Sequence, residues 1–155
     1  MAYLILGLDP ENYAPLFGMT DAELIKHNAR RVTVSAKPSF PCRVSLEDAE
    51  IGETVILANH VSHAVAGPFH AAFAIYVREK ATEAARYRDT LPPVFQSRTL
   101  SLRAFDAAGD LKSAVLATAL DADEKIRAIF DDSGIAAIHA HNAAAGCFAA
   151  RIVRD

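Results

Sequence analysis

Residues 100–120 read LSLRAFDAAGDLKSAVLATAL, and this stretch decides the fold class. Small and apolar residues at Leu100, Leu102 and Ala104 recur every second position, which is the period of a β-strand. Residues 106–110, DAAGD, carry turn residues at both ends, so we expect 111–120 to pair back as a hairpin. Strands joined by so short a loop pair antiparallel.

The remainder of the C-terminal third repeats this organisation. Two further strands are predicted over 135–141 and 147–153, joined by a tight loop of asparagine, alanine and glycine. Between the two hairpins, Asp121 opens a helix that we expect to run to about Ser133. Its apolar residues lie at helical spacing and are predicted to be buried. They are Ile126, Ile129 and Phe130.

The N-terminal part predicts short elements of both kinds. An apolar run over 3–8 indicates a buried strand. Asp9-Pro10 and the capping box Thr20–Glu23 each open a short helix. Further strands are predicted over 32–35, 54–58 and 69–77, a helix over 82–87, and a short helical piece from Thr90. We therefore predict one α+β domain over 1–155, with a mostly antiparallel or mixed sheet and short helices packed against it.

Composition excludes several classes of protein. The 155 residues are 52% hydrophobic and 23% charged, as in ordinary globular domains, and the net charge is −3. No basic stripe is present, so we expect no nucleic-acid partner. The chain has no signal-peptide pattern and no apolar run of membrane-spanning length, which predicts a cytoplasmic protein without a membrane partner. Cys42 and Cys147 are then expected to be free thiols.

Familiar nucleotide and hydrolase motifs are absent. The seven glycines are scattered, which removes the phosphate-binding loop, the dinucleotide fingerprint and the Gly-x-Ser-x-Gly nucleophile elbow. There is no His-Glu-x-x-His pair and no Cys-x-x-Cys pair. Any chemistry must therefore come from another arrangement.

One segment could hold a metal ion. His139 and His141 are two apart on a predicted strand, so they project from the same face. The loop that follows returns Cys147 to the same strand end. Imidazole and thiolate are ligands for zinc or iron, so His139, His141 and Cys147 form a candidate metal site. The glutamate that a cupin-type site adds after its second histidine is missing.

The same region could carry thiol chemistry. Cys42 is followed by Arg43, and an adjacent cation favours the nucleophilic thiolate. His141 and Asn142, with Cys147 or Cys42, have the chemistry of a nucleophile–base–orienter set. We expect the functional site where the Cys42–Arg43 segment meets the hairpin that carries the histidines. If it is a thiol site, Cys42 is expected to react with iodoacetamide faster than Cys147.

Two hypotheses of different class follow. In the first, the protein is a small-molecule-binding protein or an enzyme with a cysteine, histidine and arginine cleft, with or without a metal. In the second, it is a non-catalytic binding or interaction module, and its cysteine and histidine residues are structural, since free cysteine often packs as a small hydrophobe. A homodimer is compatible with both. Convergence of these side chains on an accessible cleft would favour the first.

Several blocks of the sequence resemble a known family. Residues 40–49 read FPCRVSLEDA, residues 102–106 read LRAFD, and residues 138–142 read IHAHN. Gly146 and Cys147 follow shortly after the last of these. Together they resemble the bacterial family known as domain of unknown function 1203, over nearly the whole chain. The resemblance implies a stand-alone bacterial protein of about this length, with no reaction attached. The family pattern has arginine at the position of His70, which makes that histidine a poor candidate for an essential ligand.

Overall fold

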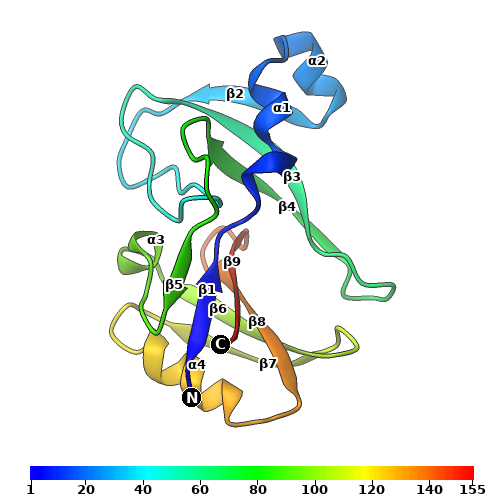
Figure 1. Cartoon of the computed structure of the whole chain (residues 1–155), viewed down its shortest axis with the longest axis vertical. Coiled ribbons are helices and arrows are strands. Elements are labelled where there is room, and N and C mark those ends of the chain that lie inside the picture. Colours follow the sequence, from blue (N-terminus) through cyan, green and yellow to red (C-terminus); the bar gives the residue numbers. More distant parts are fainter.

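The strands form two antiparallel sheets in a computed structural model that describes all of residues 1–155 (Figure 1). The larger sheet has six strands in the order β5-β1-β9-β8-β6-β7, and the smaller has three in the order β2-β3-β4. The strands of the larger sheet are β1 (Tyr3–Leu6), β5 (Arg86–Arg88), β6 (Leu100–Asp106), β7 (Leu111–Ala117), β8 (Ile135–Asn142) and β9 (Phe148–Arg154). Those of the smaller sheet are β2 (Ala29–Thr33), β3 (Thr54–His63) and β4 (Ala71–Arg78). The predicted α+β class with antiparallel sheets is confirmed.

The helices are all short. They are the 3-10 helix η1 (Pro10–Asn12) and the α-helices α1 (Ala14–Phe17), α2 (Asp21–Lys26), α3 (Pro93–Gln96) and α4 (Ala122–Phe130). Two predicted caps are present: the Asp9 carboxylate accepts the Glu11 N–H, and Thr20 and Glu23 form the capping box of α2. Asp121 stands at the N-cap of α4, but its carboxylate accepts the Thr118 N–H instead of capping the helix. No helix is both long and apolar enough to cross a membrane.

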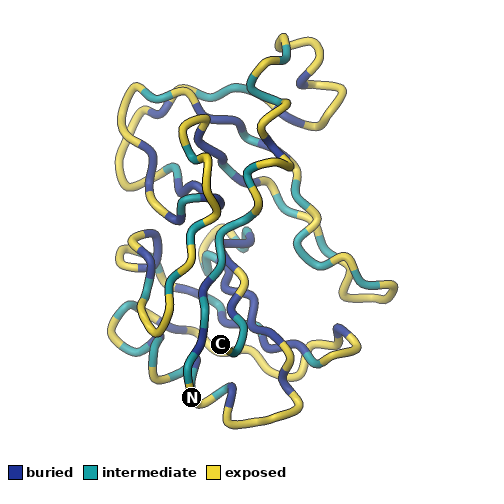
Figure 2. Tube along the Cα trace, viewed as in Figure 1, coloured by how far each residue is buried: buried dark blue, intermediate teal, exposed yellow.

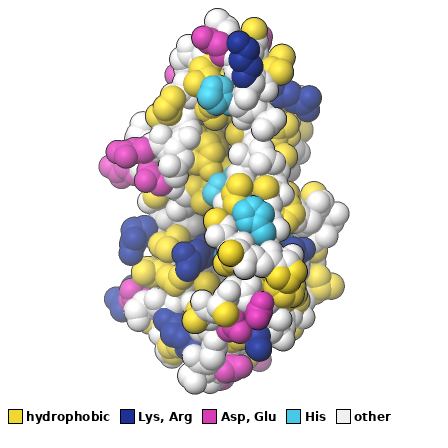
Figure 3. Space-filling view, turned by 90° about the vertical axis from the view of Figure 1, so that its right-hand side faces the viewer, with side chains coloured by type: hydrophobic (Ala, Val, Ile, Leu, Met, Phe, Trp, Pro, Cys, Tyr) yellow, Lys and Arg dark blue, Asp and Glu magenta, His cyan; other side chains and the backbone are white.

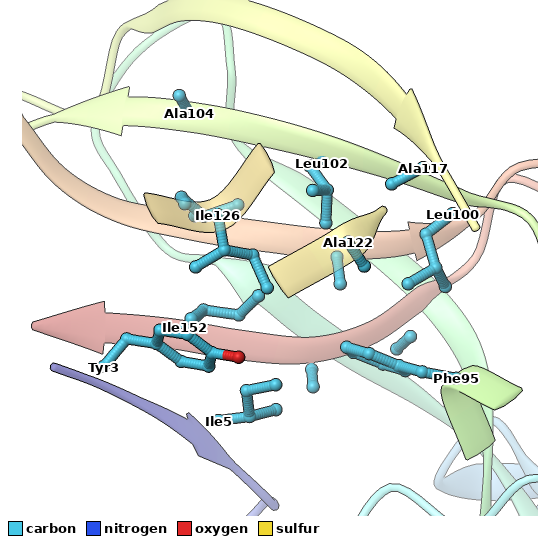
Figure 4. Packing of buried hydrophobic residues seen from close by; sticks show 14 of the residues in the cluster. Tyr3, Ile5, Phe95, Leu100, Leu102, Ala104, Ala117, Ala122, Ile126 and Ile152 are labelled. Carbon is cyan, nitrogen blue, oxygen red and sulfur yellow. The ribbon is translucent and has the colours of Figure 1, made fainter. Parts of the chain in front are cut away.

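The main core lies between α4 and one face of the larger sheet. Ile126 of α4 packs over Leu102 of β6 and Ile152 of β9 (Figure 4). Phe130 is also buried, whereas Ile129 is only partly so, and the helix ends at Phe130, before the predicted Ser133. Alternation along the strands sends every second residue of β8 away from this core, to the opposite face of the sheet.

One predicted helix is wrong. Residues 82–87 form no helix, and β5 instead pairs antiparallel with β1, with Tyr87 opposite Ile5. Pairing with a strand more than 80 residues away thus overrides the local helical pattern. The prediction missed it because Arg-Tyr-Arg is too short to show a strand period by itself.

Segment 40–49 runs between the two sheets. Leu8 donates its N–H to the carbonyl of Arg43 over 2.8 Å, and Ala85 donates to the carbonyl of Val44 over 2.9 Å. A side chain at Gly7 would lie 2.0 Å from the Val44 oxygen, so only glycine permits this crossing. On its other side the segment joins β4, because the Arg43 N–H donates to Tyr76. This segment, which we call the central segment, is largely buried, with Glu47 exposed (Figure 2).

The β3–β4 hairpin extends beyond its own sheet towards the β6–β7 turn (Figure 1). Strand β3 continues to His63, five residues past the predicted end at Ala58, so His60 and His63 lie on a strand. Near the tip, a ring nitrogen of His63 lies 2.8 Å from the carbonyl oxygen of Gly109. The hairpin thereby covers part of the sheet face that α4 leaves free.

Candidate functional site

Arg43 joins the central segment to the end of the larger sheet. It is only 2% exposed, and its guanidinium makes hydrogen bonds to two backbone carbonyls and one sulfur. Nε donates to the Phe148 carbonyl over 2.7 Å, and Nη1 donates to the Pro41 carbonyl over 2.5 Å. Nη2 donates to Sγ of Cys147 over 3.2 Å. The two segments that the sequence analysis expected to meet are therefore in contact.

The buried charge of Arg43 has no carboxylate partner: none of the ion pairs of the protein includes it. Burial lowers the pKa of this guanidinium; the neighbouring sulfur of Cys147 opposes that shift, and the positive charge of Arg98 adds to it. A buried cation is costly unless a negative charge or several acceptors compensate it. The site therefore favours negative charge next to Arg43, either on the sulfur or on a ligand.

Cys147 accepts hydrogen bonds from two side chains. Besides Arg43, Nδ2 of Asn142 donates to its sulfur over 3.3 Å. The tight turn between β8 and β9 produces this arrangement: the Asn142 N–H donates to the Cys147 carbonyl, and Gly146 adopts the φ of +78° that the turn requires. These two N–H donors fix the position of the sulfur beside the guanidinium of Arg43.

These groups line a pocket between the two sheets, which we call the Arg43 pocket. Its volume is about 460 Å³. The walls come from the central segment, β4, the link between α3 and β6, and the β8–β9 turn. The lining residues are Pro38, Ser39, Pro41, Arg43, Ala74, Tyr76, Ser97, Arg98, Thr99, Asn142, Ala144, Ala145 and Cys147. None of them is acidic, and the second arginine, Arg98, is held by Asp48 in a two-pronged ion pair of 2.5 and 2.9 Å.

Cys42 lies apart from this pocket. It is fully buried in the core of the smaller sheet, where Ile56, Ile75 and Val77 surround it, and its sulfur accepts the Arg78 N–H over 3.4 Å. The chain turns at residues 43–45, so Cys42 faces the core of the smaller sheet while the Arg43 guanidinium reaches Phe148 and Cys147 of the larger one. The structure does not bring Cys42 into the candidate site, and both cysteines are free.

His139 and His141 share one strand face, as predicted. Their ring centroids are 6.4 Å apart, and the ring of Phe148 lies 5.5 Å from the first and 5.8 Å from the second. Burial lowers the pKa of His139 to about 3 and that of His141 to about 4. Nδ1 of His141 bonds to the Gly146 carbonyl over 2.9 Å, and no hydrogen bond joins His141 to Cys147. The predicted set of cysteine, histidine and asparagine is thus only partly assembled.

The metal hypothesis gains no support. No group of three or more histidine, cysteine, aspartate or glutamate side chains is arranged to hold an ion. His139 and His141 lie together, but Cys147 turns to Arg43 and Asn142 instead of joining them.

Several lining residues were not foreseen from the sequence. Arg98, Thr99 and Tyr76 reach the pocket from elements that are distant along the chain. No local pattern marks them, since a single arginine after a short helix is indistinguishable from a surface residue. Only the packing of the two sheets around segment 40–49 brings them together.

The fold and site define an α+β protein of two antiparallel sheets with a basic, cysteine-lined pocket between them. Residues 39–154 match the family model described as "Protein of unknown function (DUF1203)", and the chain belongs to that family. The match confirms the resemblance seen in the sequence. No curated protein matches the chain, and no solved structure does.

Proposed function

We propose that the protein binds a small organic anion in the Arg43 pocket. The observation that carries this proposal is the buried guanidinium of Arg43, which lacks a carboxylate partner and lines a pocket without acidic residues. Three of its five N–H groups are used by Phe148, Pro41 and Cys147, which leaves two for a ligand. A planar carboxylate or a phosphate oxygen pair matches that donor geometry.

The pocket suits a small molecule. Its volume of about 460 Å³ lies within the range of known ligand sites, roughly 300–1,000 Å³. Pro41, Ala74 and Tyr76 provide an apolar wall, while the hydroxyls of Ser97 and Thr99 offer further polar contacts. Such a site fixes the charged end of a ligand on Arg43 and leaves its body against the apolar wall.

A second function, nucleophilic chemistry by Cys147, is favoured by the two N–H donors at its sulfur. In this proposal Arg43 stabilises the thiolate and orients the anionic group of a substrate, and Asn142 fixes the position of the sulfur. His141 has no contact with the thiol, so it is not assigned the role of base. The thiolate would attack a carbon of the bound anion that carries a leaving group, so that the sulfur–carbon bond forms as the leaving group departs with its electron pair, as iodide does from iodoacetate.

Two alkylating agents test both proposals at once. Iodoacetate and iodoacetamide deliver the same electrophilic carbon, and the Cys147 sulfur displaces iodide from either, but only iodoacetate carries a carboxylate. If Arg43 binds anions, the ratio of the iodoacetate rate to the iodoacetamide rate at Cys147 will be higher in the folded protein than in urea. Arg43→Met is expected to abolish that excess.

A matched control removes a buried arginine elsewhere. Arg78 is 8% exposed and paired with Glu53, outside the pocket, so Arg78→Met is expected to leave the rate ratio unchanged. An equal ratio in folded and unfolded wild-type protein would contradict anion binding at Arg43. It would favour the alternative that this cysteine and arginine block is structural.

A further inference from the structure

A second pocket lies beneath the β3–β4 hairpin, on the face of the larger sheet opposite α4. We call it the histidine pocket; its volume is about 280 Å³. It is lined by Ser62, His63, Pro68, Phe69, His70, Ala71, Arg103, Phe105, Leu111, Ala114, His139 and His141. It shares no lining residue with the Arg43 pocket. Histidine side chains are visible near the middle of this side of the molecule, with Lys and Arg side chains below them (Figure 3).

His139 is buried in this pocket without a hydrogen-bond partner. The residue is 4% exposed, yet neither ring nitrogen bonds to any group of the protein. Its ring lies against other rings, among them His63 at 5.0 Å and Phe105 at 4.9 Å between centroids. The one fully enclosed side-chain polar atom without a partner is the hydroxyl of Ser45, so the nitrogens of His139 remain open to the pocket and can be reached by a ligand.

The two neighbouring histidines each present one free ring nitrogen. Nε2 of His63 bonds to the Gly109 carbonyl over 2.8 Å, and Nδ1 of His141 bonds to the Gly146 carbonyl over 2.9 Å. A carbonyl can only accept, so the bonded nitrogen carries the hydrogen in each ring. In a neutral ring the other nitrogen is then an acceptor, and it suits a hydroxyl or N–H donor on a ligand.

Charge in the histidine pocket is positive and unpaired. Arg103 forms no ion pair, and its one hydrogen bond is Nε to the Ser101 hydroxyl over 3.4 Å. None of the lining residues is acidic. Asp106 lies in the adjoining pocket instead, together with Arg151. The free guanidinium of Arg103 therefore faces a site that favours an anionic group.

The apolar wall of the histidine pocket is aromatic. Phe69 and Phe105 meet edge to face with centroids 6.4 Å apart, and His63 lies 4.2 Å from Phe105. Phe69 remains 38% exposed, so one side of this wall is not covered by protein. Aromatic rings prefer such offset and edge contacts with another ring, so a flat ring is the ligand body that this wall accepts.

We propose that the histidine pocket binds a small aromatic hydroxy acid. Its carboxylate pairs with Arg103, its ring packs against Phe69 and Phe105, and its hydroxyl donates to a free imidazole nitrogen. His139 lines the same pocket and offers a further ring nitrogen without a protein partner as an acceptor for that hydroxyl. This site is independent of the Arg43 pocket, because none of its residues takes part in the function proposed there.

The test uses 4-hydroxybenzoate as the probe and the ring resonances of the histidines in long-range ¹H–¹⁵N NMR spectra as the readout. Saturable shifts of His139 and His141 are expected. Benzoate lacks the hydroxyl and phenol lacks the carboxylate. Each is expected to bind about tenfold more weakly than 4-hydroxybenzoate, which is the effect of one lost polar contact. Equal affinity for all three compounds would overturn the proposed recognition.

Two variants separate the site from general charge effects. Arg103→Gln is expected to lower the affinity for 4-hydroxybenzoate about tenfold or more. Arg151→Gln removes the same charge from the adjoining pocket and is expected to change it little, because Arg151 does not line the histidine pocket. Equal losses in both variants would contradict the assignment of the carboxylate to Arg103. His139→Phe keeps the ring packing and is expected to lose binding even if Arg103→Gln unfolds the chain.

Two further measurements decide between this proposal and others. Carboxymethylation of Cys147 fills the Arg43 pocket, and 4-hydroxybenzoate is expected to shift the histidine rings equally before and after it. Loss of the shifts would mean that the probe occupies the Arg43 pocket. Stoichiometric Zn²⁺ binding that broadens these ring signals, with no response to 4-hydroxybenzoate, would replace the proposal by a metal site.

Discussion

Arg43 donates a hydrogen bond to the sulfur of Cys147 over 3.2 Å, across 104 residues of sequence. The arginine belongs to the segment between the sheets and the cysteine to the β8–β9 turn, so this contact joins the two halves of the fold. It also places a cation and a thiol in one pocket. The same pair of residues therefore stabilises the fold and lines the candidate site, and the two roles require different tests.

The first prediction concerns the two thiols. Cys147 is expected to react with iodoacetamide in the native protein much faster than Cys42, because Cys42 is fully buried and Cys147 lines the Arg43 pocket. This reverses the order expected from the sequence. Mass spectrometry of peptides after timed alkylation measures it. In urea both thiols are expected to react, and faster labelling of Cys42 in the native state would show that the smaller core opens readily.

The second prediction concerns the structural role of Arg43. Arg43→Met leaves the carbonyls of Pro41 and Phe148 without their buried donor, which is expected to lower the free energy of unfolding by roughly 1–3 kcal/mol. Urea titration measures this loss. Arg151→Met, at an exposed position, is the control and should change stability by less than about 0.5 kcal/mol. An Arg43→Met protein as stable as wild type would mean that relief of the buried charge offsets both lost bonds.

Local sequence signals predict the C-terminal part of the fold well. The alternation in β6, the turn at Asp106–Asp110 and the period of α4 all act over a few residues, and their pairing follows from short loops. The failure at β5 has the opposite cause, because that strand exists only through its pairing with β1. Likewise β3 extends to His63 because β4 continues to pair with it.

The candidate site was predictable only in part. The shared face of His139 and His141 follows from strand geometry. The meeting of the Cys42–Arg43 segment with the β8–β9 turn was a hypothesis from residue chemistry and family resemblance, and no local pattern fixes it. Which side of the central segment faces the pocket does not follow from a local pattern either, because that depends on bonds to Leu8 and Tyr76. The choice between Cys42 and Cys147 as the accessible thiol therefore required the tertiary structure.

The third prediction concerns the main core. Phe130 is 2% exposed, and its ring packs in the core with the guanidinium of Arg154 lying 4.8 Å from the ring centroid. Phe130→Ala is expected to cost roughly 3–5 kcal/mol of unfolding free energy. Ile129→Ala, on the same helix but only partly buried, is the matched control and should cost clearly less. Equal losses in urea titrations would mean that the helix presents a different face to the sheet.

The fourth prediction concerns acid. Burial lowers the pKa of His139 to about 3 and that of His141 to about 4, from the ordinary value of 6.5. Repulsion between the protonated His139 ring and its neighbours His63 and His141, and from Arg151 and Arg103, adds to this effect. Below pH 6.5 the unfolded chain therefore binds protons that the folded chain does not. The free energy of unfolding is therefore unaffected by the titration of these two rings above pH 6.5 and decreases as the pH falls towards 4.

Urea titrations between neutral pH and about pH 5 measure this dependence, at most about 1.4 kcal/mol per pH unit for each histidine. The double variant His139→Phe, His141→Phe keeps two aromatic rings on this face of the sheet and is expected to reduce the slope, leaving the smaller part that comes from His60, whose pKa burial also lowers. His27→Phe replaces an exposed histidine and is expected to leave it unchanged. Carboxyl groups whose pKa is lowered in the folded protein also make stability depend on pH. For Glu53, whose pKa falls from 4.5 to about 2, this dependence lies at lower pH than the range of these titrations. A slope that survives undiminished in the double variant would therefore assign the acid sensitivity to groups outside the histidine pocket.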